Sequence, residues 1–530
     1  MAGSGYFRGA AILAAAGFIS KLLGALYRIP LARLLGGEGM GLYQMAYPIY
    51  TVVLSLSTAG IPVAISILVA ERLALGDVGG AKRIFRVALF LMAGTGAVFS
   101  FLVMNNAHFL AERVLREPRA YYAIAAISPA IFFASVVSVL RGYFQGFQQM
   151  KPTALSQLVE QLVRVATVLF LSWWLLPAGI EWSAAGAAFG AVTGGLAALL
   201  VLALIYKRFR SSTRMLRKGA ASPSGSTLSL MGRMLVIALP LSLGGMVMSL
   251  MQAADAVIVP LRLQLAGYSA ARSVELFGQL TGMAGTLLNL PAIVTMSIAT
   301  SLIPAVSKAA SLRKLGMVRS HLRTSLRATL LFVLPAACGL WILASPIGLL
   351  LYDLEEVGQP LSVLAPGVIF LGLYQVSSGS LQGLGKPYIP AGNFLAGVML
   401  KIFLTYKLAA LPSLGVQGAA LATVAGFALA FFLNYRSLVK LTGLSLPWQR
   451  NLLKPGAAAL FMSVVVYWFY HQSLVYMSSN RATLAAVFIG ILVYGFALVF
   501  LGAVQETDLR YVPKAGPWLA RFLKKMHLLK

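Results

Sequence analysis

The sequence predicts an all-α polytopic membrane protein with about 14 transmembrane helices, arranged as two six-helix pseudo-symmetric lobes followed by two C-terminal helices. Three observations predict this fold class. Of the 530 residues, 59% are hydrophobic and only 11% are charged, whereas a soluble domain has about 25% charged residues. Apolar runs long enough to cross a bilayer, about 20 residues each, recur along the chain. Short motifs also recur in the same order in both halves.

The apolar runs give the order of the spans. We expect them at 10–35, 42–70, 84–104, 120–140, 154–176, 184–206, 231–259, 276–304, 326–351, 361–382, 388–411, 415–435, 453–472 and 482–502. Loops that follow even-numbered spans are rich in Lys and Arg, and loops that follow odd-numbered spans are poor in them or mixed. The positive-inside rule then places both termini on the cytoplasmic side of the membrane.

Motifs repeat at an offset of about 235 residues. FQGF at 144–147 corresponds to LQGL at 381–384, and AGAA at 185–188 corresponds to QGAA at 417–420. A repeat of six spans keeps its orientation, so the lobes should be related by an axis along the membrane normal, with a cavity between them. The expected domains are an N-terminal lobe (1–210), a cytoplasmic linker (211–230), a C-terminal lobe (231–440), two additional helices (450–505) and a cytoplasmic amphipathic tail (506–530).

The first span carries cations at depth. Lys21 and Arg28 are seven residues apart and project from nearly the same helix face. A Lys or Arg near the bilayer centre costs about 2.5–3.5 kcal/mol, so such residues normally face protein or a water-filled cavity. Pro30 leaves the carbonyl near Leu26 without its helical donor. We interpret this span as one side of a cavity whose cations bind an anion. The alternative for Arg28 is that its side chain snorkels to the membrane surface.

Four more spans contain polar candidates. In the fifth, Gln157 precedes Glu160 and Arg164, which are four apart and can pair. Either the two residues form a complete ion pair with a structural role, or Arg164 faces the cavity and Glu160 modulates it. Lys401 in the eleventh span should lie about one turn from the repeat equivalent of Arg164.

Two uncharged or acidic candidates remain open. Asp255, near the outer end of the seventh span, is either an ion or proton site or a partner of Arg262. Asn289 precedes Pro291 and either contacts substrate or hydrogen-bonds another helix. Because the intramembrane charges are mainly cationic, the sequence favours a phosphate or pyrophosphate ligand over a cationic drug.

Several function classes are disfavoured. The sequence has no Walker-type phosphate loop and no Gly-x-Ser-x-Gly nucleophile motif, so we expect no enzyme, no cofactor and no catalytic residues. The four histidines lack metal-ligand spacing, and the single Cys338 excludes an intramolecular disulfide. The net charge of +29 lies mostly in loops between spans, so we expect contact with membrane lipids rather than nucleic acid. We also expect a monomer.

Particular motifs resemble a known family. SKLLG at 20–24, ARLLG at 32–36, GIPVAIS at 60–66 and RGYFQG at 141–146 resemble the MurJ and stage V sporulation protein B flippases of the multidrug/oligosaccharidyl-lipid/polysaccharide exporter superfamily. Ile29 and residues 286–290 depart from the MurJ pattern, which places the sequence closer to the sporulation branch.

The resemblance implies a flippase that moves a polyprenyl-pyrophosphate-linked saccharide, such as the peptidoglycan precursor lipid II, by alternating access. Lys21 and Arg28 match the first-helix cations of the family, and the last two helices would line a groove for the lipid tail. A coupling ion, H⁺ or Na⁺, is also implied. The alternatives are a cation-coupled multidrug antiporter of the same architecture and a membrane-embedded glycosyl transferase.

Overall fold

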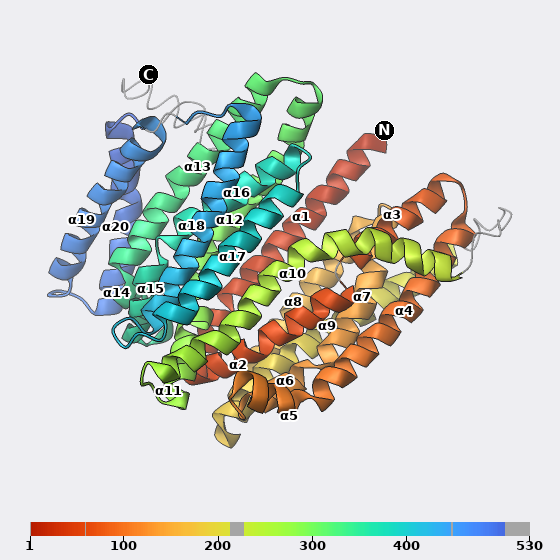
Figure 1. The fold of residues 1–530 in the computed structure, drawn as a ribbon, viewed down its shortest axis with the longest axis horizontal. Helices are drawn as coiled ribbons and strands as arrows, with labels where there is room; N and C mark the ends of the chain where they lie inside the picture. Colours follow the sequence, from red (N-terminus) through yellow and green to blue (C-terminus); the bar gives the residue numbers. More distant parts are fainter. Residues whose placement is uncertain (1, 59, 213–226, 447–448, 504–530) are drawn as a thin grey trace. The chain divides into compact units, whose positions relative to one another are not determined.

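The computed structural model describes residues 2–58, 60–212, 227–446 and 449–503, and all regular elements in these ranges are helices (Figure 1). The chain forms two compact units. Unit 1 consists of residues up to Gln264 together with Tyr268–Gly278, and unit 2 consists of Leu265–Gly267 and the residues from Gln279 onward. The predicted lobe boundaries stay predictions. Most of the expected linker and nearly all of the expected tail lie outside the described residues.

Unit 1 contains eleven α-helices in its described part. They are α1 (Ala2–Leu26), α2 (Arg28–Thr58), α3 (Ile61–Ala74), α4 (Val78–Asn105), α5 (Ala107–Phe109), α6 (Ala120–Ile127), α7 (Pro129–Gly146), α8 (Met150–Leu175), α9 (Ile180–Ser212), α10 (Thr227–Leu265) and α11 (Ala270–Phe277). A π-helical turn, Leu110–Leu115, follows α5.

Unit 2 begins within a second π-helical turn, Gly278–Ala284. Its α-helices are α12 (Gly285–Ser311), α13 (Leu315–Ile342), α14 (Ala344–Tyr352), α15 (Gly358–Leu364), α16 (Gly367–Gly383), α17 (Tyr388–Leu408), α18 (Val416–Thr442), α19 (Lys454–Ser473) and α20 (Ser479–Phe500). The last two helices pack side by side (Figure 1). Their close approach is at Gly490, where an added Cβ would lie 3.0 Å from Val466.

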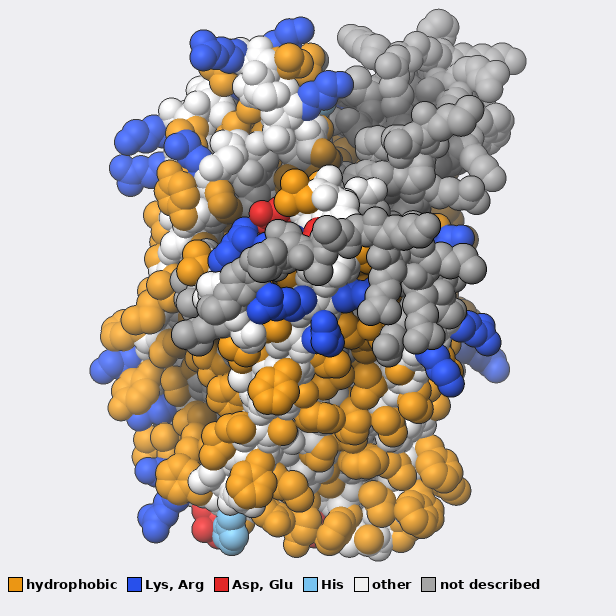
Figure 2. All heavy atoms as spheres, turned by 90° about the vertical axis from the view of Figure 1, so that its right-hand side faces the viewer, with side chains coloured by type: hydrophobic (Ala, Val, Ile, Leu, Met, Phe, Trp, Pro, Cys, Tyr) orange, Lys and Arg blue, Asp and Glu red, His pale blue; other side chains and the backbone are white. Residues whose placement is uncertain are grey.

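The predicted all-α membrane fold class is confirmed. Twelve helices in the described ranges are long and apolar enough to cross a membrane, or 13 if the bent pair α15–α16 is one span. The count of 14 is not confirmed. The first of the twelve, Ala11–Ala74, has 64 residues, which is more than twice the length that one crossing needs. Figure 2 shows one face whose lower half is mostly hydrophobic, with Lys and Arg side chains at the top, across the middle and along the left edge.

The long N-terminal segment is broken at two places. Tyr27 separates α1 from α2, because Pro30 has no backbone N–H to donate to the carbonyl of Leu26. Helical hydrogen bonding resumes at Leu31, whose N–H donates to the carbonyl of Tyr27 at 3.1 Å. Gly36, with φ of 64° and ψ of −171°, then interrupts α2. The helix is therefore interrupted where Pro30 was expected to leave the carbonyl of Leu26 without its donor, and Gly36 adds a second break in a conformation that only glycine adopts without strain.

Two predicted span ends are wrong because the helices continue past the apolar run. Helix α7 extends to Gly146, so Arg141, expected in a cytoplasmic loop, lies on a helix. Helix α13 begins at Leu315, so Arg319 and Arg323 also lie on a helix and not in a loop. Hydropathy marks where the apolar surface ends, whereas the backbone hydrogen bonds continue wherever the side chains find polar partners.

The same helix contact occurs once in each unit. On α7, Cβ atoms added at Gly142 and Gly146 would meet Pro62 O at 2.6 Å and Val69 Cβ at 2.7 Å on α3. On α16, Cβ atoms added at Gly379 and Gly383 would meet Ala299 O at 2.7 Å and Val306 Cβ at 2.9 Å on α12. Every pair of corresponding residues, such as 142 and 379 or 69 and 306, is 237 positions apart. These repeated contacts support the predicted duplication.

The ends of α7 and α16 also match. Gln149 N–H donates to Phe144 O at 2.9 Å, and Lys386 N–H donates to Leu381 O at 3.0 Å. The residue before each donor has a left-handed backbone conformation, with φ of 57° at Gln148 and 74° at Gly385. The two FQGF/LQGL motifs therefore close their helices with the same hydrogen-bonded turn.

We expect Gly142→Leu and Gly379→Leu each to lower the free energy of unfolding by about 1–3 kcal/mol, because the new side chain would overlap a neighbouring backbone. Gly392→Leu on α17 is the matched control, since an added Cβ there meets nothing within 4 Å. Thermal unfolding in detergent measures the effect. Equal midpoints for all three variants would contradict the close helix contact.

Candidate anion-binding site

One face of α8 presents four polar side chains to the interior of unit 1. Gln157, Glu160, Gln161 and Arg164 follow each other at helical spacings of three and four, so they share a face. Helix α1 packs against this face: a Cβ added at Gly24 would lie 3.4 Å from Gln161 Nε2. The absence of a side chain at Gly24 therefore brings α1 close to the polar face.

Glu160 bridges two arginines. Its Oε1 accepts a hydrogen bond from Arg164 Nη2 at 2.8 Å, and its Oε2 accepts one from Arg141 Nη2 at 2.8 Å. Arg141 is also anchored through its Nε, which donates to Ser156 Oγ at 3.0 Å. The predicted Glu160–Arg164 pair is thus confirmed, and Arg141 from α7 is a third member that the sequence interpretation had assigned to a loop.

Arg28 joins this cluster through tyrosines of α2. Its guanidinium lies within electrostatic reach of the hydroxyls of Tyr27, Tyr43 and Tyr47, and Tyr47 and Tyr27 also interact with Arg164. The Tyr27 and Tyr43 hydroxyls are 3.2 Å apart. Arg28 forms no ion pair with any described residue.

Tyrosine rings cover the site from α2. Tyr43, Tyr47 and Tyr50 are spaced by four and three residues, and successive ring centroids are 5.8 Å apart. Tyr43 and Tyr50 are buried, whereas Tyr47 is half-buried and is the accessible ring of the series. Tyr50 lies within electrostatic reach of Arg164, Glu160 and Arg141.

Unused hydrogen-bonding capacity is concentrated on α1, α2 and α8. Ten buried side-chain nitrogen or oxygen atoms among the described residues have no hydrogen-bond partner, and seven belong to these helices. The seven atoms are Ser20 Oγ, Arg28 Nε, Gln44 Oε1, Thr153 Oγ1, Gln157 Oε1, Gln161 Nε2 and Arg164 Nε. Leaving a buried polar group unpaired costs about 1–3 kcal/mol, so such a concentration is typical of a site that receives a polar ligand.

The charge balance of the site favours an anion. The site holds three arginines, Arg28, Arg141 and Arg164, and one carboxylate, that of Glu160, which leaves an excess of two positive charges. Arginine binds phosphate oxygens through two parallel N–H donors, and the unpaired Nε atoms of Arg28 and Arg164 leave one side of each guanidinium available. The arrangement is suited to a phosphate or pyrophosphate group.

The other predicted residues are placed differently. Lys21 lies on an exposed side of α1. Asn289 donates to Gly285 O of its own helix at 2.8 Å, so the expected bond to another helix is not the one it makes. Asp255 is buried on α10, 9% exposed, and its pairing with Arg262 stays a prediction. Lys401 and Asn289 belong to unit 2, so they are described apart from the arginine cluster.

Lys401 corresponds directly to Arg164, which corrects the expected one-turn displacement. A Cβ added at Gly194 on α9 would meet Glu160 O at 2.8 Å and Arg164 Cβ at 3.1 Å. A Cβ added at Gly426 on α18 would meet Gly397 O at 2.8 Å and Lys401 Cβ at 2.9 Å. Lys401 is therefore the buried basic residue of unit 2 at the same position of the repeated helix pair, and Gly397 stands where unit 1 has Glu160.

The sequence interpretation missed Arg141 and the tyrosines. The tyrosine spacing in YQMAYPIY at 43–50 was a usable signal, because positions 43, 47 and 50 share one helix face. Arg141 gave no such signal, because its partner Glu160 comes from another helix and lies 19 residues away.

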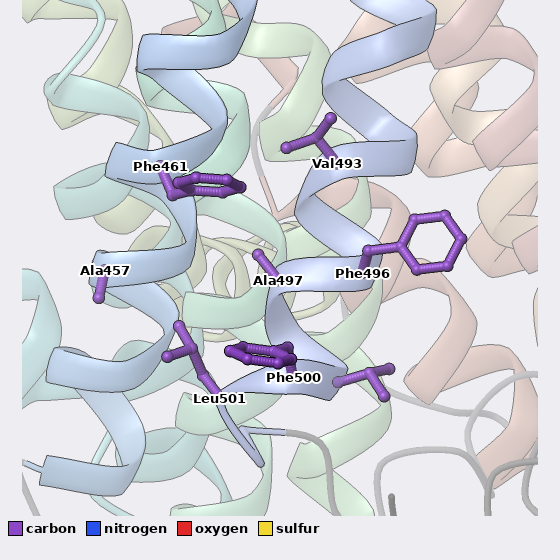
Figure 3. Close-up of a pocket in the computed structure, with 8 residues that line it drawn as sticks. Ala457, Phe461, Val493, Phe496, Ala497, Phe500 and Leu501 are labelled. Atoms are coloured by element: carbon purple, nitrogen blue, oxygen red, sulfur yellow. The ribbon is translucent and has the colours of Figure 1, made fainter. Parts of the chain in front are cut away.

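A second, apolar site lies between α19 and α20. A groove of about 600 Å³ is lined by Ala457, Phe461, Val493, Phe496, Ala497, Val499, Phe500 and Leu501. Figure 3 shows Phe461 on α19 and Phe500 on α20 pointing towards the space between the two helices. Lys454 stands beside the groove and donates to Leu501 O at 2.8 Å.

The fold and these sites define a multi-pass membrane protein of the transporter class. The model of the polysaccharide biosynthesis protein family matches residues 6–310, and the MatE model matches residues 240–407. The chain belongs to the polysaccharide biosynthesis protein family, within the multidrug/oligosaccharidyl-lipid/polysaccharide exporter superfamily.

Curated relatives cover nearly the whole chain. Stage V sporulation protein B of Bacillus subtilis is 32% identical over 98% of this chain and 100% of its own length. Lipid II flippase MurJ of the same organism is 26% identical over 87% of this chain and 86% of its own.

Solved structures confirm the fold. Lipid II flippase MurJ in an inward closed conformation matches with a TM-score of 0.68 and 19% identity, over 92% of this chain and 98% of that one. An inward-facing multidrug resistance MATE family transporter matches with a TM-score of 0.65 and 16% identity, over 80% of this chain and 96% of that one.

Proposed function

We propose that this protein is a flippase that carries a polyprenyl-pyrophosphate-linked saccharide from the inner to the outer leaflet of the bacterial plasma membrane. The observation that carries the proposal is the arginine cluster of unit 1, with three guanidiniums and one carboxylate, on helices that carry seven unpaired buried polar atoms. Such a cluster recognises the pyrophosphate, which is the most strongly charged part of this substrate class.

The remaining substrate parts have matching surfaces. The half-buried ring of Tyr47 is placed to contact a sugar attached to the pyrophosphate. The apolar groove between α19 and α20 is suited to part of a polyprenyl tail, since all eight residues that line it are apolar. Lys21, exposed on α1, and Lys401, buried on α17, are proposed as further headgroup cations. Gln157 and Asn289 are proposed as polar contacts.

A cation-coupled multidrug antiporter is the second candidate, because the MatE model matches residues 240–407. That function would need carboxylates accessible to a cation. Glu160 is held by Arg141 and Arg164, so it is poorly placed to bind a cationic drug. Asp255 remains the candidate for an ion-coupling site. The buried charge excess of the arginine cluster favours the flippase.

Reconstitution in vesicles tests the proposal. Purified protein is incorporated into phosphatidylglycerol-containing vesicles with a fluorescent undecaprenyl-pyrophosphate saccharide, and a membrane-impermeant quencher reports the lipid that has crossed. We expect protein-dependent crossing of this lipid and none of a fluorescent phosphatidylcholine. Equal crossing of both lipids, or export of ethidium without crossing of the saccharide lipid, would contradict the proposal and, in the second case, favour the antiporter.

A further inference from the structure

We infer that Glu160 is an internal counter-anion that competes with the substrate's pyrophosphate for Arg164, and so sets how readily the substrate is released. The inference rests on the proposed function and names a residue that controls affinity and release. It is based on two observations. The two arginines that Glu160 bridges differ in how many of their donors are hydrogen-bonded, and the corresponding helix pair in unit 2 has no carboxylate at this position.

Arg141 is fixed by the protein itself. Its Nη2 binds Glu160 and its Nε binds Ser156, whose hydroxyl in turn donates to Thr153 O at 2.8 Å. Both donors on one edge of its guanidinium are therefore engaged. Arg141 holds one oxygen of Glu160 in place whether or not the other oxygen is in use.

Arg164 is only partly engaged. Its Nη2 binds Glu160, whereas its Nε is buried without a hydrogen-bond partner among the described residues. A pyrophosphate that binds Nε and Nη2 together would displace Glu160 Oε1 from Nη2 and form a bidentate contact. Glu160 would then remain bound to Arg141, so the carboxylate is not left unpaired during the exchange.

The second unit shows that the helix pair does not need this carboxylate for packing. Gly194 approaches the backbone oxygen of residue 160, and Gly426 approaches the backbone oxygen of Gly397 at the same distance of 2.8 Å. Of the Glu160 side chain, only Cγ, at 3.4 Å from the added Cβ, is among the nearest atoms, and the carboxylate is not. A glutamate at this position is therefore better explained by its effect on Arg164 than by a need of the fold.

The electrostatic consequence is a weaker and more reversible site. A carboxylate beside a bound pyrophosphate repels it and offers Arg164 an alternative partner, so both effects lower affinity. A flippase must release its substrate at the far leaflet, so a site that binds too tightly would slow turnover. Glu160 thus lowers the affinity for the substrate and makes its release faster.

Binding measurements with Glu160→Gln test the inference. Gln keeps the shape and one acceptor oxygen but removes the charge. We expect the Kd for geranylgeranyl pyrophosphate in detergent to fall about tenfold, which corresponds to about 1.4 kcal/mol, and the flipping rate at saturating substrate to fall as well. Glu160→Asp, which keeps the charge, should stay closer to the wild type. Geranylgeraniol, which lacks phosphate, should bind all variants alike.

A matched control and a second readout guard against misfolding. Glu71→Gln removes the same charge from an exposed pair with Arg233 and should change neither Kd nor rate. If Glu160→Gln is less stable, the rise in its unfolding temperature on adding geranylgeranyl pyrophosphate should still exceed that of the wild type.

An unchanged or higher Kd for Glu160→Gln, with no larger thermal shift, overturns the inference. The proposed function fails separately, if wild type and Arg164→Ala bind the probe equally or not at all.

Discussion

Replacing Arg28 by alanine is expected to lower the kcat/KM for flipping of an undecaprenyl-pyrophosphate saccharide by about 30- to 1000-fold, or about 2–4 kcal/mol. Arg28 is the cation of the cluster that forms no ion pair with any described residue, and its Nε is buried without a partner. No carboxylate of the described residues therefore competes with the substrate for its guanidinium, and its loss removes a contact that the protein does not replace.

Lysine and an exposed arginine provide the controls. Arg28→Lys keeps the charge but loses the two parallel donors, so we expect an intermediate rate. Arg86→Ala removes an exposed arginine of α4 and should leave the rate unchanged. Flipping of the fluorescent saccharide lipid in vesicles measures all three. A wild-type rate for Arg28→Ala in protein that remains folded would exclude Arg28 from the headgroup site.

Replacing Arg119 by alanine is expected to lower the free energy of unfolding by about 3 kcal/mol, because it leaves a buried carboxylate unpaired. Glu117 is only 4% exposed. Arg119 binds both of its oxygens, at 2.8 and 3.2 Å, and extends its Nη1 to Glu38 on α2. The hydrogen bonds that Arg119 donates to Glu117, followed by the one that it donates to Glu38, raise the pKa of Arg119 above its ordinary value, so its charge persists at every physiological pH.

Thermal unfolding in detergent measures this effect. Arg113→Ala, at an exposed site nearby, should leave the midpoint unchanged. The double variant Arg119→Leu/Glu117→Leu should recover part of the lost stability, because it removes the unpaired charge as well. If Arg119→Ala and Arg113→Ala unfold at the same temperature, the pair makes no net contribution.

Composition was sufficient to predict the fold class, and residue spacing was sufficient to predict one ion pair. An apolar chain must satisfy its backbone within helices, so the all-α membrane fold follows from 59% hydrophobic residues. Glu160 and Arg164 are four apart on one helix, so their pairing could be read from spacing. Both predictions depend only on local regularity.

Contacts between helices could not be predicted in the same way. Arg141 joins Glu160 across two helices, and nothing in its own neighbourhood marks it as buried. The correspondence of Lys401 with Arg164 was also missed, because motifs at slightly different offsets were combined. The structure separates them: contacts up to Leu171 and Leu408 repeat at 237 positions, whereas Gly186 corresponds to Gly418 at 232.

That change of offset locates a place where the chain accepts extra length. The five-residue difference falls between Leu171 and Gly186, where α8 and α9 are each four residues longer at their shared end than α17 and α18, while the packing on either side is the same. An epitope inserted at Pro177 or Ala178, both exposed, should therefore leave the helices intact. Antibody access to that epitope on whole cells would then report which side of the membrane the connection between α8 and α9 occupies.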